Sequence, residues 1–174
     1  ITATVTDLNE ANPVFSTGAN AAVNVAEGDT AVGTYTATDA DGTATQTYSI
    51  VAVGDDASSV DHDLFAVNAG SGVLTFASAP DFETPGCGAG NNGNTCVVVV
   101  QVTDGARTDT ITVTATVTDV EIAITDSQTG SVAEGTGTGS AIMTVATTGD
   151  SMAGNSWAIT AGNDDGEFAI AAGT

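Results

Sequence analysis

Alternation of threonine with small or branched apolar residues is the feature that most constrains the fold of this chain. The clearest case is Thr110–Thr118, TITVTATVT, and a shorter version, ITATVT, occupies Ile1–Thr6. A period of two residues places apolar side chains on one face of an extended strand and threonines on the other. The other segments that we predict as strands are Ala21–Val25, Ala31–Thr38, Thr45–Val53, Leu64–Val67, Val73–Phe76 and Val97–Thr103.

The segments between the predicted strands have the composition of turns. They are rich in glycine, asparagine and aspartate, the residues that turns between short strands require. No segment has the period of an amphipathic helix. Many short strands at this spacing predict an all-β protein built as a Greek-key β-sandwich.

The chain also repeats itself in a fixed order. ITATVTD at Ile1–Asp7 returns as ITVTATVTD at Ile111–Asp119, and VAEG occurs at Val25–Gly28 and again at Val132–Gly135. Such self-similarity indicates tandem structural repeats. Two further pairs keep the same order, Tyr48–Ile50 with Trp157–Ile159 and Asp63–Val67 with Gly166–Ile170.

These repeats predict the domain organisation. Residues 1–6 are expected to be the last strand of a preceding repeat, 7–118 a complete repeat and 119–174 the first part of the next. A repeat that stops at Thr174 lacks its closing strands and would leave unpaired edges. We therefore expect the chain to continue, or a neighbouring chain to supply the strands. A strand exchange through Ile1–Asp7 is one such arrangement.

The charge balance restricts the partners. The chain has 22 acidic residues and a single basic one, Arg107, for a formal net charge of −21. Such a surface repels nucleic acid and anionic membrane because it cannot neutralise phosphates. It attracts hard divalent cations instead, although a purely solubilising acidic surface explains part of the excess. Hydrophobic residues make up 41% of the chain, which favours a folded protein over a disordered one.

The two cysteines, Cys87 and Cys96, lie in a segment rich in glycine and asparagine. A disulfide between them would staple a loop in an oxidising, extracellular compartment. Two free thiols are the alternative. With the distant His62 they fall short of a tetrahedral zinc site.

Acidic motifs follow one another through the predicted complete repeat. They are Asp7–Phe15 (DLNEANPVF), Ala26–Gly28 (AEG), Asp39–Gly42 (DADG), Asp81–Glu83 (DFE) and Thr103–Gly105 (TDG). In order and spacing they resemble the cadherin repeat, with its D-x-N-[DE]-N-x-P linker, glutamate, D-x-D, D-x-E and late aspartate. The resemblance covers essentially the whole chain and implies tandem Greek-key β-sandwich repeats of cadherin or immunoglobulin-like type. The Thr, Gly and Ala content resembles bacterial cadherin-like repeats of surface adhesins or extracellular fibres.

The resemblance implies calcium at the two ends of each repeat. Calcium takes 6–8 oxygen ligands, and the loops of a sandwich converge at its ends. At the start of the repeat, the family's ligand positions correspond to Asp7, Asn9, Glu10, Asp39, Asp41 and Asp104. At its far end they correspond to Glu27, Asp81, Glu83, Asp119, Glu121 and Asp150, and Glu134 would face a further domain.

The sequence departs from the family pattern at three places. Ala11 is inserted before Asn12, the second linker at Asp119–Ile122 lacks the asparagine and the proline, and Thr148–Asp150 replaces the D-x-D motif. We expect fewer or more weakly bound ions at the second junction. Each motif taken alone also fits an ordinary turn.

These observations favour a non-enzymatic structural or adhesive module of a microbial extracellular adhesin or fibre. Its partners would be adjacent repeats and identical chains, and its location extracellular or at the cell surface. The alternative is a ligand- or carbohydrate-binding accessory module, for which aromatic residues are scarce. Carboxylates abound, so residue types alone leave a glycosidase open. The single histidine, His62, has no partner motif for nucleophilic catalysis.

Overall fold

The computed structural model describes residues 2–3, 8–41, 45–125, 128–137, 140–149 and 169. The chain divides into two compact units, Ile1–Asp119 and Val120–Thr174. Predictions for Asp7, Asp150 and most of the strand at Ile1–Thr6 fall outside the described residues, and with them the proposed strand exchange. In the described part, no helix is long and apolar enough to cross a membrane.

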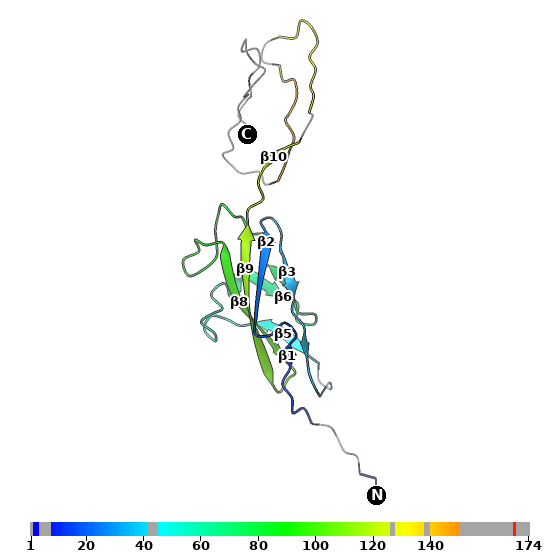
Figure 1. The fold of residues 1–174 in the computed structure, drawn as a ribbon, viewed down its shortest axis with the longest axis vertical. Coiled ribbons are helices and arrows are strands. Elements are labelled where there is room, and N and C mark those ends of the chain that lie inside the picture. Colours follow the sequence, from blue (N-terminus) through cyan, green and yellow to red (C-terminus); the bar gives the residue numbers. More distant parts are fainter. Residues whose placement is uncertain are drawn as a thin grey trace. The chain divides into compact units, whose positions relative to one another are not determined.

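The first unit contains a four-stranded sheet in the order β2-β9-β8-β5 (Figure 1). Its strands are β2 (Asn20–Ala26), β9 (Thr108–Thr118), β8 (Thr95–Thr103) and β5 (Thr47–Ile50). β2 runs parallel to β9, and the other neighbours are antiparallel. The long alternating segment is thus a central strand, with a partner on each side.

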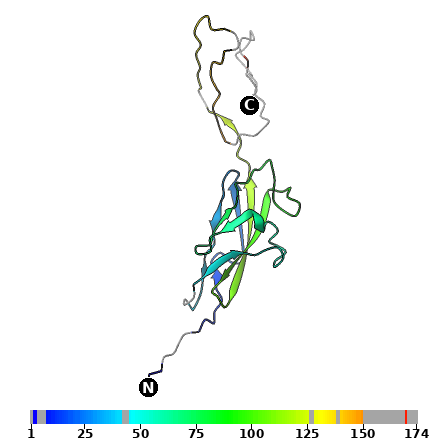
Figure 2. The same cartoon turned by 180° about the vertical axis from the view of Figure 1, so that it is seen from behind.

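A second sheet packs against the first (Figure 2). It has the order β3-β7-β6, and its strands are β3 (Ala31–Thr34), β7 (Val73–Phe76) and β6 (Phe65–Val67). A separate pair joins β1 (Val14–Phe15) to β4 (Ala37–Thr38). Antiparallel strands in two packed sheets confirm the predicted all-β sandwich.

The core lies between the two sheets, as the alternation predicted. On β9 the residues Ile111, Val113, Ala115 and Val117 are buried, while the threonines between them are half-buried. Leu74 and Phe76 face them from β7 as part of the same buried cluster. Because each fully buried valine or leucine side chain contributes about 1.5–3 kcal/mol, this cluster is the main source of stability.

Three predicted strands are shorter than the sequence indicated, at Ala31–Thr38, Leu64–Val67 and Thr45–Val53. The segment predicted at Ala31–Thr38 breaks at Tyr35, whose N–H donates to the Gly72 carbonyl before the chain moves to pair with β1. This close approach of two main-chain segments requires glycine at position 72. Gly72 has φ +69°, and an added Cβ would lie 2.2 Å from the main-chain carbonyl oxygen of Tyr35. Leu64, predicted as strand, ends a short 3-10 helix, η1 (His62–Leu64).

The strand predicted at Thr45–Val53 ends at Ile50. Past this point, side-chain oxygens rather than a strand accept the main-chain N–H groups along the edge of β8. Val51 still donates to the Val99 carbonyl. Beyond it, the Ser59 hydroxyl accepts the Val99 N–H at 3.0 Å, and the Asp61 carboxylate accepts the Val97 N–H at 2.7 Å. Ser59 and Asp61 are buried, so the polar groups of this edge are satisfied without a longer strand.

The predicted disulfide between Cys87 and Cys96 is present, and the Cα atoms of its cysteines are 4.7 Å apart. Both cysteines are buried. Cys87 and Gly93 form a small antiparallel bridge, exchanging two main-chain hydrogen bonds of 2.9 and 3.0 Å. The glycine-rich excursion is therefore closed into a compact loop before β8 continues.

The second unit is described only in part. Its strands are β10 (Ala123–Ile124) and β11 (Thr147–Thr148), which pair antiparallel. The Gln128 amide joins the two segments, since it donates to the carbonyls of Thr125 and Ala146 at 2.7 Å. Most residues described in this unit are exposed.

Candidate metal centre

Two groups of oxygen-bearing side chains lie at opposite ends of β9 in the first unit. One consists of Asn9, Asp39, Asp41 and Asp104, and is called here the linker cluster. Asp104 precedes the start of β9, whereas Glu27, a member of the other group, has its N–H bonded to the carbonyl of Thr118 at the strand's end. An eleven-residue strand spans roughly 35 Å, so the two groups are separate sites.

Asp41 ties the linker to the domain. Its Oδ2 accepts the main-chain N–H groups of both Glu10 and Ala11 at 2.6 Å. Its own N–H donates to Asp39 Oδ1 at 2.9 Å. The Asp39–Asp41 turn therefore holds the segment beside Asn9. The Glu10 side chain is exposed, and what these contacts define is its main chain.

Asp104 is the buried acid of the linker cluster, with 7% of its surface exposed. Its Oδ1 accepts the N–H groups of Arg107 at 2.6 Å and Ala106 at 2.7 Å. These two bonds, with a further contribution from the Asn9 side chain, hold the pKa of Asp104 below its usual value. The carboxylate is charged at neutral pH although it is buried.

Three buried oxygens of the linker cluster have no hydrogen-bond donor among the described residues. They are Asn9 Oδ1, Asp39 Oδ2 and Asp104 Oδ2. A buried acceptor without a donor costs about 1–3 kcal/mol, so native proteins rarely leave three together. Carboxylate and amide oxygens are the ligands that calcium prefers. The three oxygens without hydrogen-bond donors therefore suit a hard divalent cation as ligands.

The second group consists of Glu27, Asp81 and Glu83, called here the Glu27 cluster. One carboxylate oxygen from each residue lies within 4.8 Å of the others. Two oxygens bound to one calcium at 2.3–2.6 Å are at most about 5 Å apart, so the spacing fits a shared ion. Glu27 is buried, and Asp81 and Glu83 are exposed.

Local main-chain geometry brings these three carboxylates together. Glu27 directly follows β2, and its Oε2 accepts the N–H of Phe82 at 2.9 Å. Asp81 Oδ1 accepts the N–H groups of Glu83 at 3.0 Å and Thr84 at 2.9 Å. The aspartate thereby closes a turn that presents Glu83 beside Glu27.

The carboxylates at this end of the unit affect one another's ionisation. Loss of solvent raises the pKa of Glu83, and the negative charges of Glu27 and Asp119 raise it further. The single basic side chain of the chain, Arg107, hydrogen-bonds Asn12 at 3.3 Å, near the other end of β9. A bound divalent cation would change the sign of these interactions.

The structure leaves part of the predicted ligand set untested. Asp7 and Asp150 lie outside the described residues. Glu121 and Glu134 belong to the second unit, and both are exposed. Asp119 is close enough to affect the pKa of Glu83. The assignment of all these residues as ligands stays a prediction.

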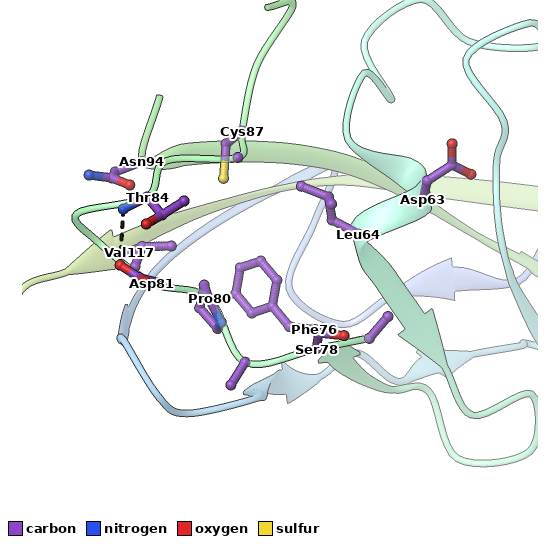
Figure 3. Close-up of a pocket in the computed structure, with 13 residues that line it drawn as sticks. Asp63, Leu64, Phe76, Ser78, Pro80, Asp81, Thr84, Cys87, Asn94 and Val117 are labelled. Atoms are coloured by element: carbon purple, nitrogen blue, oxygen red, sulfur yellow. Dashed lines mark hydrogen bonds between the residues drawn. The ribbon is translucent and has the colours of Figure 1, made fainter. Parts of the chain in front are cut away.

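A cavity of about 300 Å³ lies beside the Glu27 cluster (Figure 3). Its walls are mostly apolar and include Leu64, Phe76, Pro80 and Val117. Asp81 of the cluster also lines this cavity. Figure 3 draws the hydrogen bond by which the Thr84 N–H donates to Asp81 Oδ1.

Sequence reasoning missed three polar residues that organise this region. Asp61 is buried and accepts the N–H groups of Gly88 and Val97, one on each carboxylate oxygen at 2.7 Å. Asn94 donates to the Phe82 carbonyl at 2.9 Å. Asp109 accepts the Phe15 N–H at 3.0 Å and so fixes β1. All four bonds join residues at least 12 positions apart in sequence, and no local pattern predicts them.

Comparisons with known proteins agree with the sandwich. No protein-family model and no curated sequence matches the chain. Among solved structures it is similar to mouse clustered PcdhgC3 EC1-3, with a TM-score of 0.50 and 25% identity over 67% of this chain and 36% of that one. Human protocadherin-24 EC1-2 has a TM-score of 0.48 and 20% identity over 81% of this chain and 60% of that one. The chain spans only about a third of the first neighbour's length, 36%. The fold is cadherin-like.

Proposed function

We propose that this chain is a structural or adhesive module of a microbial extracellular fibre or surface adhesin, stiffened by calcium at the junctions between its repeats. The observation that carries the proposal is the linker cluster, where three buried oxygens lack donors and the linker is tied to the domain. The family-like order of the acidic motifs and the cadherin-like fold support the same function. No catalytic role is proposed.

Calcium would be held by the residues that already converge. In the linker cluster these are Asn9, Asp39, Asp41 and Asp104, with Asp7 and Glu10 as further ligands. At the other end of the repeat, the Glu27 cluster would be completed by Asp119, Glu121 and Asp150, with Glu134 serving a further junction. The ion would supply positive charge where carboxylates otherwise repel one another, and would tie flexible linkers to folded domains.

An extracellular location is consistent with the disulfide, because such bonds persist in oxidising compartments. Adjacent repeats and identical chains in a fibre are the proposed partners. Microbial origin rests on the composition, in which glycine alone contributes 21 residues.

A carbohydrate-binding role receives less support from the aromatic residues. Sugar platforms need exposed rings. In the described part of the chain, the rings of Phe15, Tyr35, Tyr48, Phe65 and Phe76 are each at most 6% exposed. Phe82 is partly buried against the same core.

Isothermal titration calorimetry with calcium tests the proposed function. We expect dissociation constants of roughly 10⁻⁴–10⁻³ M, the range of extracellular calcium modules. Asp104→Asn should weaken one class of sites and Glu27→Gln another, because each removes a charge from a different end of β9. Asp55→Asn, an exposed loop aspartate, is the matched control and should leave both classes unchanged. Absence of calcium binding by the unaltered chain would overturn the proposal.

A further inference from the structure

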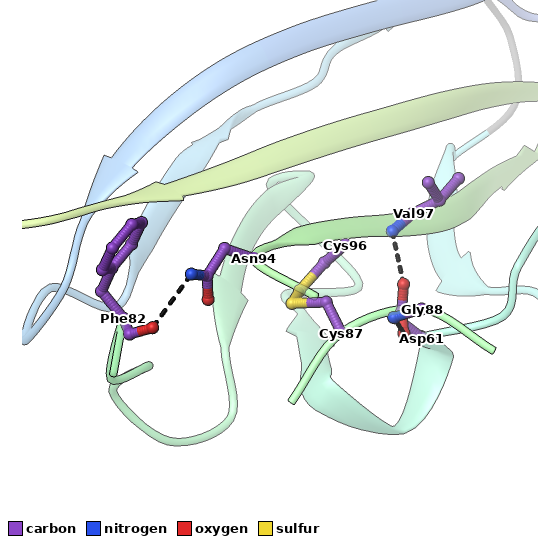
Figure 4. The surroundings of a disulfide bond; sticks show 7 residues. All are labelled: Asp61, Phe82, Cys87, Gly88, Asn94, Cys96 and Val97. Atoms are coloured by element: carbon purple, nitrogen blue, oxygen red, sulfur yellow. Dashed lines mark hydrogen bonds between the residues drawn. A yellow bond between two sulfur atoms is a disulfide. The ribbon is translucent and has the colours of Figure 1, made fainter. Parts of the chain in front are cut away.

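The peptide of Phe82 is held from both sides, between two carboxylates of the Glu27 cluster. Its N–H donates to Glu27 Oε2 at 2.9 Å, and its carbonyl accepts the side-chain N–H of Asn94 at 2.9 Å (Figure 4). Asp81 precedes Phe82 and Glu83 follows it. The Asn94 bond therefore fixes the main chain from which both carboxylates project.

Asn94 is itself fixed by two connections. Its carbonyl accepts the N–H of Val117 on β9 at 2.7 Å. Two residues further along the chain, Cys96 is fully buried and is joined to Cys87, four residues after Glu83. The disulfide thus closes residues 87–96, including Asn94, into a loop and joins its end at Cys96 to the segment that leads back from Cys87 to Glu83 (Figure 4).

The rest of this loop has little intrinsic order. Residues 86–94 read GCGAGNNGN, and glycine loses more conformational freedom on folding than any other residue. Asp61 holds Gly88 of this loop and Val97 just after it, on the side away from Phe82. Without the disulfide, Asn94 would keep its bond to Val117 but lose the covalent closure that restrains the segment leading back to Glu83.

We propose that Asn94, locked by the Cys87–Cys96 disulfide, is a positioning residue for the calcium ligands Asp81 and Glu83, so that calcium affinity at the Glu27 cluster depends on the oxidation state of the disulfide. This inference rests on the proposed calcium function. Residues that orient metal ligands without touching the ion typically contribute 10–100-fold in affinity. In reduction by a phosphine, the disulfide accepts two electrons from phosphorus and its S–S bond breaks. Water supplies the two protons of the resulting thiols and the oxygen of the phosphine oxide.

Calorimetry on the 174-residue chain tests the inference with calcium alone as the probe. The class of sites lost in Glu27→Gln identifies the Glu27 cluster, and the class lost in Asp104→Asn serves as an internal reference. Asn94→Ala should weaken the first class about 10-fold or more and leave the second unchanged. Asn92→Ala, an exposed asparagine of the same loop, should alter neither. Thermal unfolding in chelator verifies that each variant is folded.

The unaltered chain, oxidised or reduced with phosphine, provides a second measurement that needs no substitution. We expect the affinity of the Glu27 class to fall several-fold on reduction while the reference class keeps its affinity. Unchanged affinity of the Glu27 class in folded Asn94→Ala, or after verified reduction, would overturn the inference while leaving the calcium function intact. Absence of any calcium binding would contradict both.

Discussion

Buried polar side chains fix the loops of this sandwich by hydrogen bonding to their main-chain groups. Asp61 is 4% exposed, and each of its carboxylate oxygens accepts one main-chain N–H, from Gly88 and from Val97. Both carboxylate oxygens are therefore satisfied by main-chain donors, and no lysine or arginine takes part. One side chain thereby joins the disulfide loop to the edge of β8.

Replacing Asp61 by asparagine should destabilise the domain. The amide keeps one acceptor oxygen, and its NH₂ group faces an N–H that can no longer be satisfied. We expect the free energy of unfolding to fall by about 1–3 kcal/mol in a urea titration. Asp63→Asn, two residues away with an exposed side chain, should change it by less than about 0.5 kcal/mol. Equal stability of the two variants would contradict the role assigned to Asp61.

Tyr35 predicts how stability depends on alkaline pH. Burial raises the pKa of Tyr35 above its usual value of 10.0. The unfolded chain therefore loses this proton at lower pH than the folded chain, so the contribution is complete below pH 10 and is lost as pH rises from 10 toward the folded value. Because the chain contains no lysine, few other groups titrate in this window.

Urea titrations at several pH values check this prediction. The stability of the unaltered protein should fall more steeply above pH 10 than that of Tyr35→Phe, which has no phenolic proton. Below pH 9 the difference between the two proteins should stay constant. Parallel curves across the whole range would show that Tyr35 does not titrate differently in the two states.

At the scale of the strand, β9 combines two faces with different energetic roles. Val113 is fully buried in the core, whereas Thr114 is half-buried on the opposite face. Val113→Ala removes two buried methyl groups and leaves a cavity, which should cost about 2–3 kcal/mol of unfolding free energy. Thr114→Ala on the same strand should cost about 1 kcal/mol or less, through lost β-propensity. Denaturant titration of both variants measures the difference.

The alternation of apolar and polar residues predicted the bounds of strands well where the burial of one face determines them. It failed where contacts between residues distant in sequence end a strand. Val73–Phe76 was predicted with its observed bounds, and β9 extends only two residues before the predicted start at Thr110. The strand predicted to reach Val53 ends early because Ser59 and Asp61 occupy the edge of β8. The two-residue strand β1 was missed because it is too short to show any alternation.

The candidate site was predictable from the sequence in its residue types, but not in the contacts that position those residues. Residue types that attract calcium stand out in the sequence, and the structure brings Glu27, Asp81 and Glu83 together. The residues that we propose hold these carboxylates in place, Asn94, Cys87 and Cys96, lie in a loop without any distinctive pattern. Asn94 acts on Phe82 across a fold-dependent contact, which sequence alone does not reveal.

At the scale of the whole molecule, the acidic residues that the structure describes lie in turns, loops and the short helix η1, with the exception of Asp109. Among the described strands, Asp109 is the only charged residue, and it is used to bind the Phe15 N–H. The described strands therefore carry little charge, and the carboxylates are concentrated in connecting segments, including those at the ends of β9. Under the proposed function, cations bound there would act on the linkers.

Small-angle X-ray scattering of the chain in calcium and in chelator is the most direct test of the central claim. If calcium stiffens the junctions, millimolar calcium should increase the maximum dimension and give the scattering profile of a rod, and chelator should restore that of a flexible chain. Asp104→Asn and Glu27→Gln should each reduce the change. Superimposable profiles with and without calcium, at concentrations where calorimetry shows binding, would contradict the account.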